Sequence, residues 1–250
     1  MNFSSLYNLQ DEILGALSDF ARKEEFPFVL TGGTALVRFL LKRTYRVSYD
    51  LDFFYQGLSL EEWSKRELEV FLLGRFPLVD FRSLSSSTLN MWRAVIGNGS
   101  LMVAVDFVED PFSGIFETVP LEDFQPLKME TAQEGVYFRK VFAITSYTRE
   151  EKVIERIKDV VDLIELDKLI FLQDFILQTY SRIMKQNFGP LNRRKFLTKF
   201  SGLSKIIKGA QEEVNKILDE TLETPLTAGD LLEWLEEKEQ LLAKSFQLNL

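Results

Sequence analysis

The fold is decided by residues 26–55, which read FPFVLTGGTALVRFLLKRTYRVSYDLDFFY. Residues 26–30 are a short apolar run, typical of a buried strand, and the run stops at the turn residues Gly32 and Gly33. Residues 35–42 then look helical, and residues 47–55 read as a second strand. The stretch therefore predicts a strand, a glycine turn, a helix and another strand.

Helix and strand signals also alternate around this stretch. Apolar residues recur at helical spacing over residues 6–20, which predicts an opening helix that packs on a sheet. Asn98 and Gly99 lie between the strand-like residues 89–96 and 101–108. Because this dipeptide favours tight hairpin turns, we expect two antiparallel strands here.

Helical features dominate the remainder. Ser59 with Glu62 forms a capping box that opens a helix, and Thr227 with Asp230 forms another. Residues 134–147 are β-branched and aromatic, so strand and helix compete there, and we favour a helix. Beyond position 150 the strand signals vanish and long helical patterns take over.

These patterns predict two domains of an α+β chain. Residues 1–150 are expected to form a mixed or antiparallel sheet flanked by helices, and residues 151–250 a helical bundle. With 46% apolar and 27% charged residues, the chain of 250 residues has the composition of a globular protein with a substantial core.

Two missing residue types restrict the chemistry. The chain has no Cys and no His, which excludes disulfides, thiolate nucleophiles, Cys-type metal sites and Ser-His-Asp hydrolysis. Polar catalysis must therefore rest on carboxylates, Lys, Arg, hydroxyls and hard cations.

Two neighbouring acids are the first candidate site. A single residue separates Asp50 from Asp52, so on a strand both side chains project from the same face. Adjacent carboxylates repel unless a cation lies between them, and a hard divalent ion such as magnesium is the natural occupant. The alternative is a pair of solvated turn or edge-strand residues.

The glycine turn is the second candidate site. At Gly32 and Gly33 a ligand can approach the backbone closely, and free N–H groups at the start of a helix favour phosphate oxygens. A plain tight turn is the alternative. Together, the turn and the acid pair join a phosphate cradle to a metal site.

These two motifs resemble a known family. The residues TGGTAL at 31–36 and RVSYDLDFF at 46–54 are similar to the signature of the AbiEii/AbiGii-type toxin branch of the DNA polymerase β-like nucleotidyltransferase superfamily. The resemblance covers roughly residues 26–165, and the rest of the chain matches only as a helical appendage. It implies a nucleotidyltransferase-like sheet in the first domain.

The resemblance also implies residue roles. In that superfamily a glycine turn holds a nucleoside triphosphate, an Asp-x-Asp pair binds two magnesium ions, and a later strand supplies a third carboxylate. Carried onto this sequence, the catalytic and metal-binding residues are Asp50, Asp52 and Asp106, and the nucleotide-binding residues are Gly32, Gly33, Thr34, Arg46, Ser48 and Lys140. For the third carboxylate, Glu109 and Asp110 compete with Asp106, which we expect at a strand end.

Further roles stay open between alternatives. Arg46 either reaches a phosphate or forms an ion pair, and Lys140 is expected to neutralise triphosphate charge. Asp159 and Asp162 share a helix face, where they orient the site, cap contacts between domains or are simply solvated.

The function that the resemblance implies is nucleotidyl transfer. Magnesium would activate an acceptor hydroxyl and stabilise the leaving pyrophosphate, while the nucleoside triphosphate, for example ATP, donates its monophosphate. The acceptor stays open between tRNA, another RNA end, a protein hydroxyl and a small molecule. The resemblance also implies the toxin of a type IV toxin–antitoxin pair, whose antitoxin would be a partner.

Three rival readings use the same acids. A haloacid-dehalogenase-like phosphatase fits poorly, because a strongly apolar strand should precede Asp50. A metal-dependent glycosyltransferase would use the acid pair for a nucleotide sugar, without needing the glycine turn. The third is a catalytically silent interaction module, which the convergence of all three carboxylates would argue against.

A basic segment is expected to bind the acceptor. The chain carries a net charge of −8, yet residues 175–211 hold eight bases and no acid. We expect Arg193, Arg194 and Lys195 in this segment to grip a polyanion such as RNA; the alternative is a solvated basic face whose aromatic residues pack in the core. No membrane span or secretory signal is evident, so the cytoplasm is the expected location.

Overall fold

The computed structural model divides the chain into two compact units, Met1–Thr131 and Ala132–Leu250. It describes all residues except 1–2, 43–44, 58–59, 61–62, 64, 85–89, 100, 111, 113, 147–153, 155, 224 and 249–250. The division therefore lies before position 150, where the sequence predicts the domain boundary. Position 150 lies outside the described residues, and so do Ser59 and Glu62, the residues of the first expected capping box.

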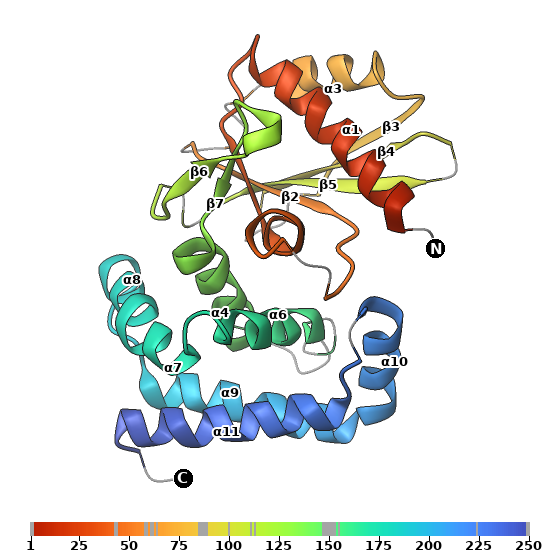
Figure 1. Cartoon of the computed structure of the whole chain (residues 1–250). Coiled ribbons are helices and arrows are strands. Elements are labelled where there is room, and N and C mark those ends of the chain that lie inside the picture. Colours follow the sequence, from red (N-terminus) through yellow and green to blue (C-terminus); the bar gives the residue numbers. More distant parts are fainter. Residues whose placement is uncertain are drawn as a thin grey trace. The chain divides into compact units, whose positions relative to one another are not determined.

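In the described part of the first unit, seven strands form one mixed sheet in the order β3-β4-β5-β2-β1-β7-β6 (Figure 1). The strands are β1 (Phe28–Thr31), β2 (Leu51–Tyr55), β3 (Leu78–Ser83), β4 (Met91–Gly97), β5 (Met102–Glu109), β6 (Thr118–Pro120) and β7 (Lys128–Glu130). The pairs β2–β5 and β1–β7 are parallel, and the other neighbours are antiparallel. The expected hairpin is confirmed as β4 and β5.

Helices accompany this sheet. They are α1 (Phe3–Ala21), α2 (Gly32–Thr34) with its wider continuation η1 (Ala35–Leu40), α3 (Lys65–Leu73) and the short η3 (Glu122–Phe124). The apolar stripe of α1, which includes Leu9 and Ile13, is fully buried in the core. Against it lies an aromatic layer in which the rings of Phe53 and Phe107 stack with centroids 5.8 Å apart.

Strand register gives the sheet two different faces. Leu30, Phe53 and Phe107 are paired across β1, β2 and β5, and all belong to the core. Since the side chains of one strand alternate between faces, the next row along the strands projects from the opposite face. That row contains Asp52 and Asp106, which are directly paired.

Two expectations about the acids need correction. The second strand begins at Leu51 rather than at position 47, so Asp50 immediately precedes β2 instead of lying within it. Asp106 is not at a strand end, because β5 continues to Glu109.

The described regular elements of the second unit are all helical. The helix expected over 134–147 is confirmed for residues 134–145, whereas residue 147 lies outside the described residues. These elements are η4 (Ala132–Val136), α4 (Tyr137–Thr145), α6 (Ile157–Asp167), α7 (Leu172–Phe175), η5 (Ile176–Tyr180), α8 (Ser181–Asn187), α9 (Arg193–Gly209), α10 (Gln211–Thr221) and α11 (Ala228–Phe246). Helices α9 and α11 run side by side (Figure 1). The capping box of Thr227 and Asp230 is confirmed at the start of α11.

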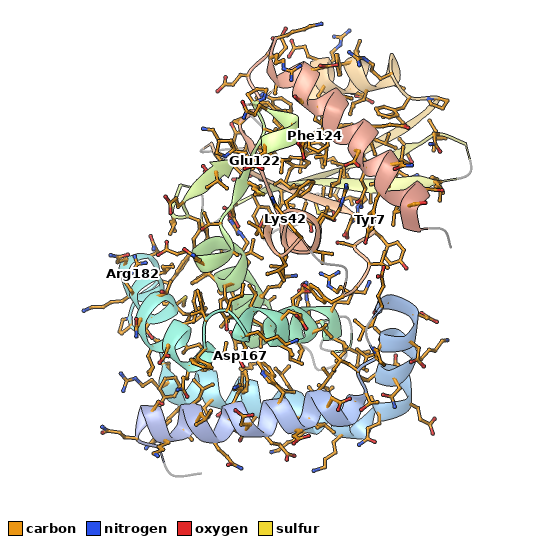
Figure 2. The ribbon with its side chains drawn as sticks, in the orientation of Figure 1. Tyr7, Lys42, Glu122, Phe124, Asp167 and Arg182 are labelled. Carbon is orange, nitrogen blue, oxygen red and sulfur yellow. The ribbon has the colours of Figure 1, made fainter. Side chains whose placement is uncertain are left out.

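Asp167 connects helices α6, α7 and α11 of the second unit through its carboxylate. At the end of α6, its carboxylate accepts hydrogen bonds from the backbone N–H of Leu172 at 2.6 Å and from Trp234 Nε1 at 3.1 Å. Lys238 Nζ lies 2.9 Å from the same carboxylate, and Asp167 is labelled in Figure 2.

Among the described residues, no helix is long and apolar enough to cross a membrane.

Candidate active site

A row of polar side chains crosses the sheet on the face opposite the aromatic core. Thr31 on β1, Asp52 on β2, Asp106 on β5 and Arg93 on β4 are consecutive partners in the strand register. Thr31 Oγ1 also donates a 2.7 Å hydrogen bond to Glu130, a fully buried residue of β7. The sheet therefore brings Asp52 and Asp106 together, as the sequence predicts, and adds Arg93 beside them.

Arg93 and Asp106 form a two-pronged ion pair. Arg93 Nε lies 2.6 Å from Asp106 Oδ1, and Arg93 Nη2 lies 2.6 Å from Oδ2. The pKa of the Arg93 guanidinium is raised, chiefly by these hydrogen bonds and further by the charges of Asp106, Asp50 and Asp52. Arg93 is therefore a cation held beside Asp50, Asp52 and Asp106, which together form the acid cluster.

The carboxylates do not form a ready-made metal site. Within the described part of the chain, no three acidic side chains converge as a bound metal ion would require. Glu109 and Asp110, the competitors for the third position, are engaged locally: Glu109 accepts from Asn90 Nδ2 at 2.7 Å, and Asp110 accepts from the backbone of Phe112 at 2.9 Å.

The glycine turn lies against the acid pair. Gly32 has φ +71°, in the left-handed region, and a Cβ atom at Gly32 would stand 2.1 Å from Asp52 Oδ2. Thr34, two residues on, donates its hydroxyl to the backbone carbonyl of Asp50. The turn and the two acids are therefore one connected structure.

Arg46 and Ser48 pack against the turn at Gly33. A Cβ atom at Gly33 would stand 2.3 Å from Arg46 Nη2 and 2.8 Å from Ser48 Oγ. Both side chains are buried, so Arg46 is not a surface ion pair. Gln10 of α1 donates a 2.9 Å hydrogen bond to the carbonyl of Ser48, which ties this support to the opening helix.

Lys140, Asp159 and Asp162 come together within the second unit. Lys140 Nζ lies 2.5 Å from Asp159 Oδ1 and 2.8 Å from Asp162 Oδ2. All three residues are buried, so the acids are not a solvated helix face. The sequence motifs that contain these residues predict roles for all three but not the ion pairs between them.

The aromatic residues of the basic segment mostly pack inward. Tyr180, Phe196 and Phe200 are buried, whereas Phe188 is 51% exposed. Phe188 lines a hollow of about 560 Å³ whose wall also contains Lys195. All three expected acceptor-binding residues, Arg193, Arg194 and Lys195, are exposed on α9. The Arg193 guanidinium lies 5.5 Å from the ring centre of Phe246.

A larger hollow in the first unit, about 1010 Å³, lies apart from the acid row. Its wall includes Tyr7, Lys42, Glu122 and Phe124, labelled in Figure 2. None of the expected catalytic or nucleotide-binding residues lines it.

Comparison with known proteins bears on the fold. No protein-family model matches the chain, and no curated protein matches it in sequence. The solved structure of JHP933 from Helicobacter pylori is similar, with a TM-score of 0.50 and 16% identity, over 97% of this chain and 94% of that one. MenT4, the nucleotidyltransferase toxin Rv2826c from Mycobacterium tuberculosis H37Rv, aligns with a TM-score of 0.35 and 16% identity over 91% of this chain and 70% of that one.

At 16% identity the likeness to JHP933 extends to the fold alone, and the TM-score for MenT4 is too low to establish a shared fold. The expected fold class is confirmed by the structure itself: a mixed sheet flanked by helices, followed by a helical unit, consistent with a nucleotidyltransferase-like fold.

Proposed function

We propose that this chain is a magnesium-dependent nucleotidyltransferase, which transfers a nucleoside monophosphate from a nucleoside triphosphate to an acceptor hydroxyl. The observation that carries the proposal is the pairing of Asp52 with Asp106 across β2 and β5, directly beside the Gly32 turn. The resemblance of the turn and acid motifs to the AbiEii/AbiGii-type branch supports the same chemistry.

The side chains present fit magnesium in kind. Asp50, Asp52 and Asp106 offer only carboxylate oxygens, which are the ligands of hard divalent ions. These three residues would hold the two expected ions, which would supply charge neutralisation for the triphosphate and a lowered pKa for the acceptor hydroxyl. Their charges already act on one cation, Arg93.

The chain's own residues position the substrate. The backbone at Gly32 offers a close approach to phosphate oxygens, and Thr34 fixes the turn to the backbone of Asp50. Arg46 and Ser48 pack against the turn. A contact between Lys140 and the triphosphate stays a prediction, because its described partners are Asp159 and Asp162.

For the acceptor we propose RNA, tRNA included. The support is the basic segment, where Arg193, Arg194 and Lys195 lie exposed, and where Lys195 lines the same hollow as the accessible ring of Phe188. A toxin role with an antitoxin partner also belongs to the proposal, and rests on the sequence resemblance alone.

The test is a transfer assay with each of the four labelled nucleoside triphosphates, magnesium and total cellular RNA or protein. We expect label to appear on RNA, to require magnesium and to be lost in the Asp52→Asn variant. Absence of label from every acceptor would overturn the proposal. Labelled nucleotide sugars in a parallel reaction test the glycosyltransferase alternative.

A second candidate function is a catalytically silent interaction module. The observation that favours it is the Arg93–Asp106 ion pair, which takes both oxygens of the expected third carboxylate. A silent module would bind neither divalent ions nor triphosphates, so direct binding measurements separate the two candidates.

A further inference from the structure

Arg93 and Asp106 differ sharply in exposure. The Asp106 side chain is 8% exposed, whereas the Arg93 side chain is 40% exposed. The guanidinium can therefore leave for solvent by rotating its own side chain, while the carboxylate stays in place. The backbones of β4 and β5 are fixed to each other by the antiparallel ladder and need not move.

The acid cluster needs a cation near it. Asp52 and Asp106 are adjacent in the sheet, with Asp50 just before β2, and clustered carboxylates repel one another when nothing neutralises them. Arg93 supplies that charge, and an arginine keeps it at every physiological pH. A divalent ion entering the cluster would meet the guanidinium already bound to both oxygens of Asp106.

We propose that Arg93 is a displaceable internal cation: it holds Asp106 while no divalent ion is bound, and gives up this carboxylate when one binds. Arg93 thereby sets the affinity of the cluster for divalent ions, as a positioning residue for Asp106. This inference rests on the proposed function, because it requires the acids to take up a divalent ion.

The strands provide a matched control. Arg82 on β3 is the direct cross-strand partner of Arg93, and it pairs with Asp80 instead of with the acid cluster. Arg82→Gln therefore removes the same charge from the neighbouring strand and leaves Asp106 paired. Arg93→Lys keeps the charge but cannot reproduce the two-pronged geometry.

The experiment measures Mn²⁺ binding to the full chain by electron paramagnetic resonance of the free ion. Arg93→Gln should bind Mn²⁺ roughly tenfold more tightly than the parent, because a competing charge is gone. Arg82→Gln should stay within about twofold of the parent and Arg93→Lys should fall between the two. Equal or weaker binding by a folded Arg93→Gln protein would overturn the inference.

A second measurement follows the ion pair in the parent protein itself. In the ¹⁵N spectrum of the parent, the Nε–H signal of Arg93, identified by its loss in Arg93→Lys, should shift and exchange faster with water when Mg²⁺ is added. An unchanged signal at saturating Mg²⁺ would overturn the inference.

The two proposals fail in distinguishable ways. Binding that is equal in the parent and Arg93→Gln, and lost in Asp52→Asn, would overturn the role of Arg93 and leave the metal-dependent function standing. Absence of Mn²⁺ binding from all variants, or binding unaffected by Asp52→Asn, would overturn the proposed metal site and the inference with it.

Discussion

Gly32 lies directly against the carboxylate of Asp52, so closely that a Cβ atom on Gly32 would stand 2.1 Å from Oδ2. Gly32 also has φ +71°, a backbone conformation that is strained for residues other than glycine. Glycine is thus required twice, once by the backbone and once by Asp52. The turn and the acid therefore depend on one another in a way that neither motif reveals alone.

Gly32→Ala tests this dependence. We expect the free energy of unfolding to fall by about 2 kcal/mol, from backbone strain together with displacement of Asp52, and nucleotide affinity to fall with it. Urea unfolding and titration with a fluorescent triphosphate measure both effects. Gly99→Ala is the control, because Gly99 has φ +112° with nothing within 4 Å of its Cβ position; it should show strain but normal nucleotide binding.

Asp52→Asn tests the acid pair. The substitution removes one negative charge at nearly constant shape, so nucleotidyl transfer should fall about a hundredfold or more, while the urea midpoint stays close to that of the parent. Asp80→Asn, on the edge strand β3, removes a similar charge away from the cluster and should leave transfer unchanged. A fully active Asp52→Asn protein would contradict the metal-dependent mechanism.

Local patterns predicted the fold class and the placement of Asp52 beside Asp106, whereas the roles assigned to the site residues stay predictions. The apolar stripe of α1, the glycine turn, the Asn98–Gly99 hairpin and the capping box at Thr227 are properties of neighbouring residues, and each is confirmed. Strands β3, β6 and β7 were not predicted. Strands β6 and β7 have only three residues each, and their pairing partners are set by the sheet rather than by local sequence.

The sequence did not predict Arg93 as the partner of Asp106, because the register of β4 against β5 depends on the length of the loop between them. A two-residue turn at Asn98 and Gly99 would pair residue 97 with residue 100, which places Met91 opposite Asp106. The observed ladder pairs Gly97 with Met102 and so brings Arg93 to that place. The hairpin signal was present in the sequence, but the two additional loop residues that decide the partner of Asp106 were not foreseeable from it.

Lys140→Met tests the buried ionic cluster of the second unit. The change leaves Asp159 and Asp162 without the ammonium group that lies within 2.8 Å of each. Buried carboxylates that lose a close partner charge are costly, so we expect a loss of about 3–5 kcal/mol in the free energy of unfolding. Lys185→Met, at an exposed position on α8, should change it by less than about 0.5 kcal/mol.

The triple variant Lys140→Met, Asp159→Asn, Asp162→Asn separates stability from chemistry. Removing all three charges should recover much of the lost stability, because no buried charge is then unpaired. If the recovered protein still transfers nucleotides at the parental rate, the predicted contact between Lys140 and the triphosphate is wrong.

Arg194→Glu with Lys195→Glu tests RNA as the acceptor. Both residues are exposed near the start of α9, and Lys195 lines the hollow where Phe188 is accessible. Unlike Arg193, they have no described contact with Phe246. When a phosphate contact is lost, RNA binding releases fewer counterions. The double variant should therefore bind RNA roughly tenfold more weakly, and the slope of the logarithm of the binding constant against the logarithm of the salt concentration should become shallower by about 0.7 per contact. Filter binding over a series of salt concentrations measures both.

Lys216→Glu with Lys244→Glu is the control for net charge. It makes the same change in charge at exposed positions of α10 and α11, so it should weaken RNA binding much less. Triphosphate binding should survive in both double variants, because Gly32, Asp50 and Asp52 belong to the first unit. If the α9 variant and the control bind RNA with the same affinity and the same salt slope, α9 is not the acceptor site, and a protein or small-molecule acceptor becomes the better hypothesis.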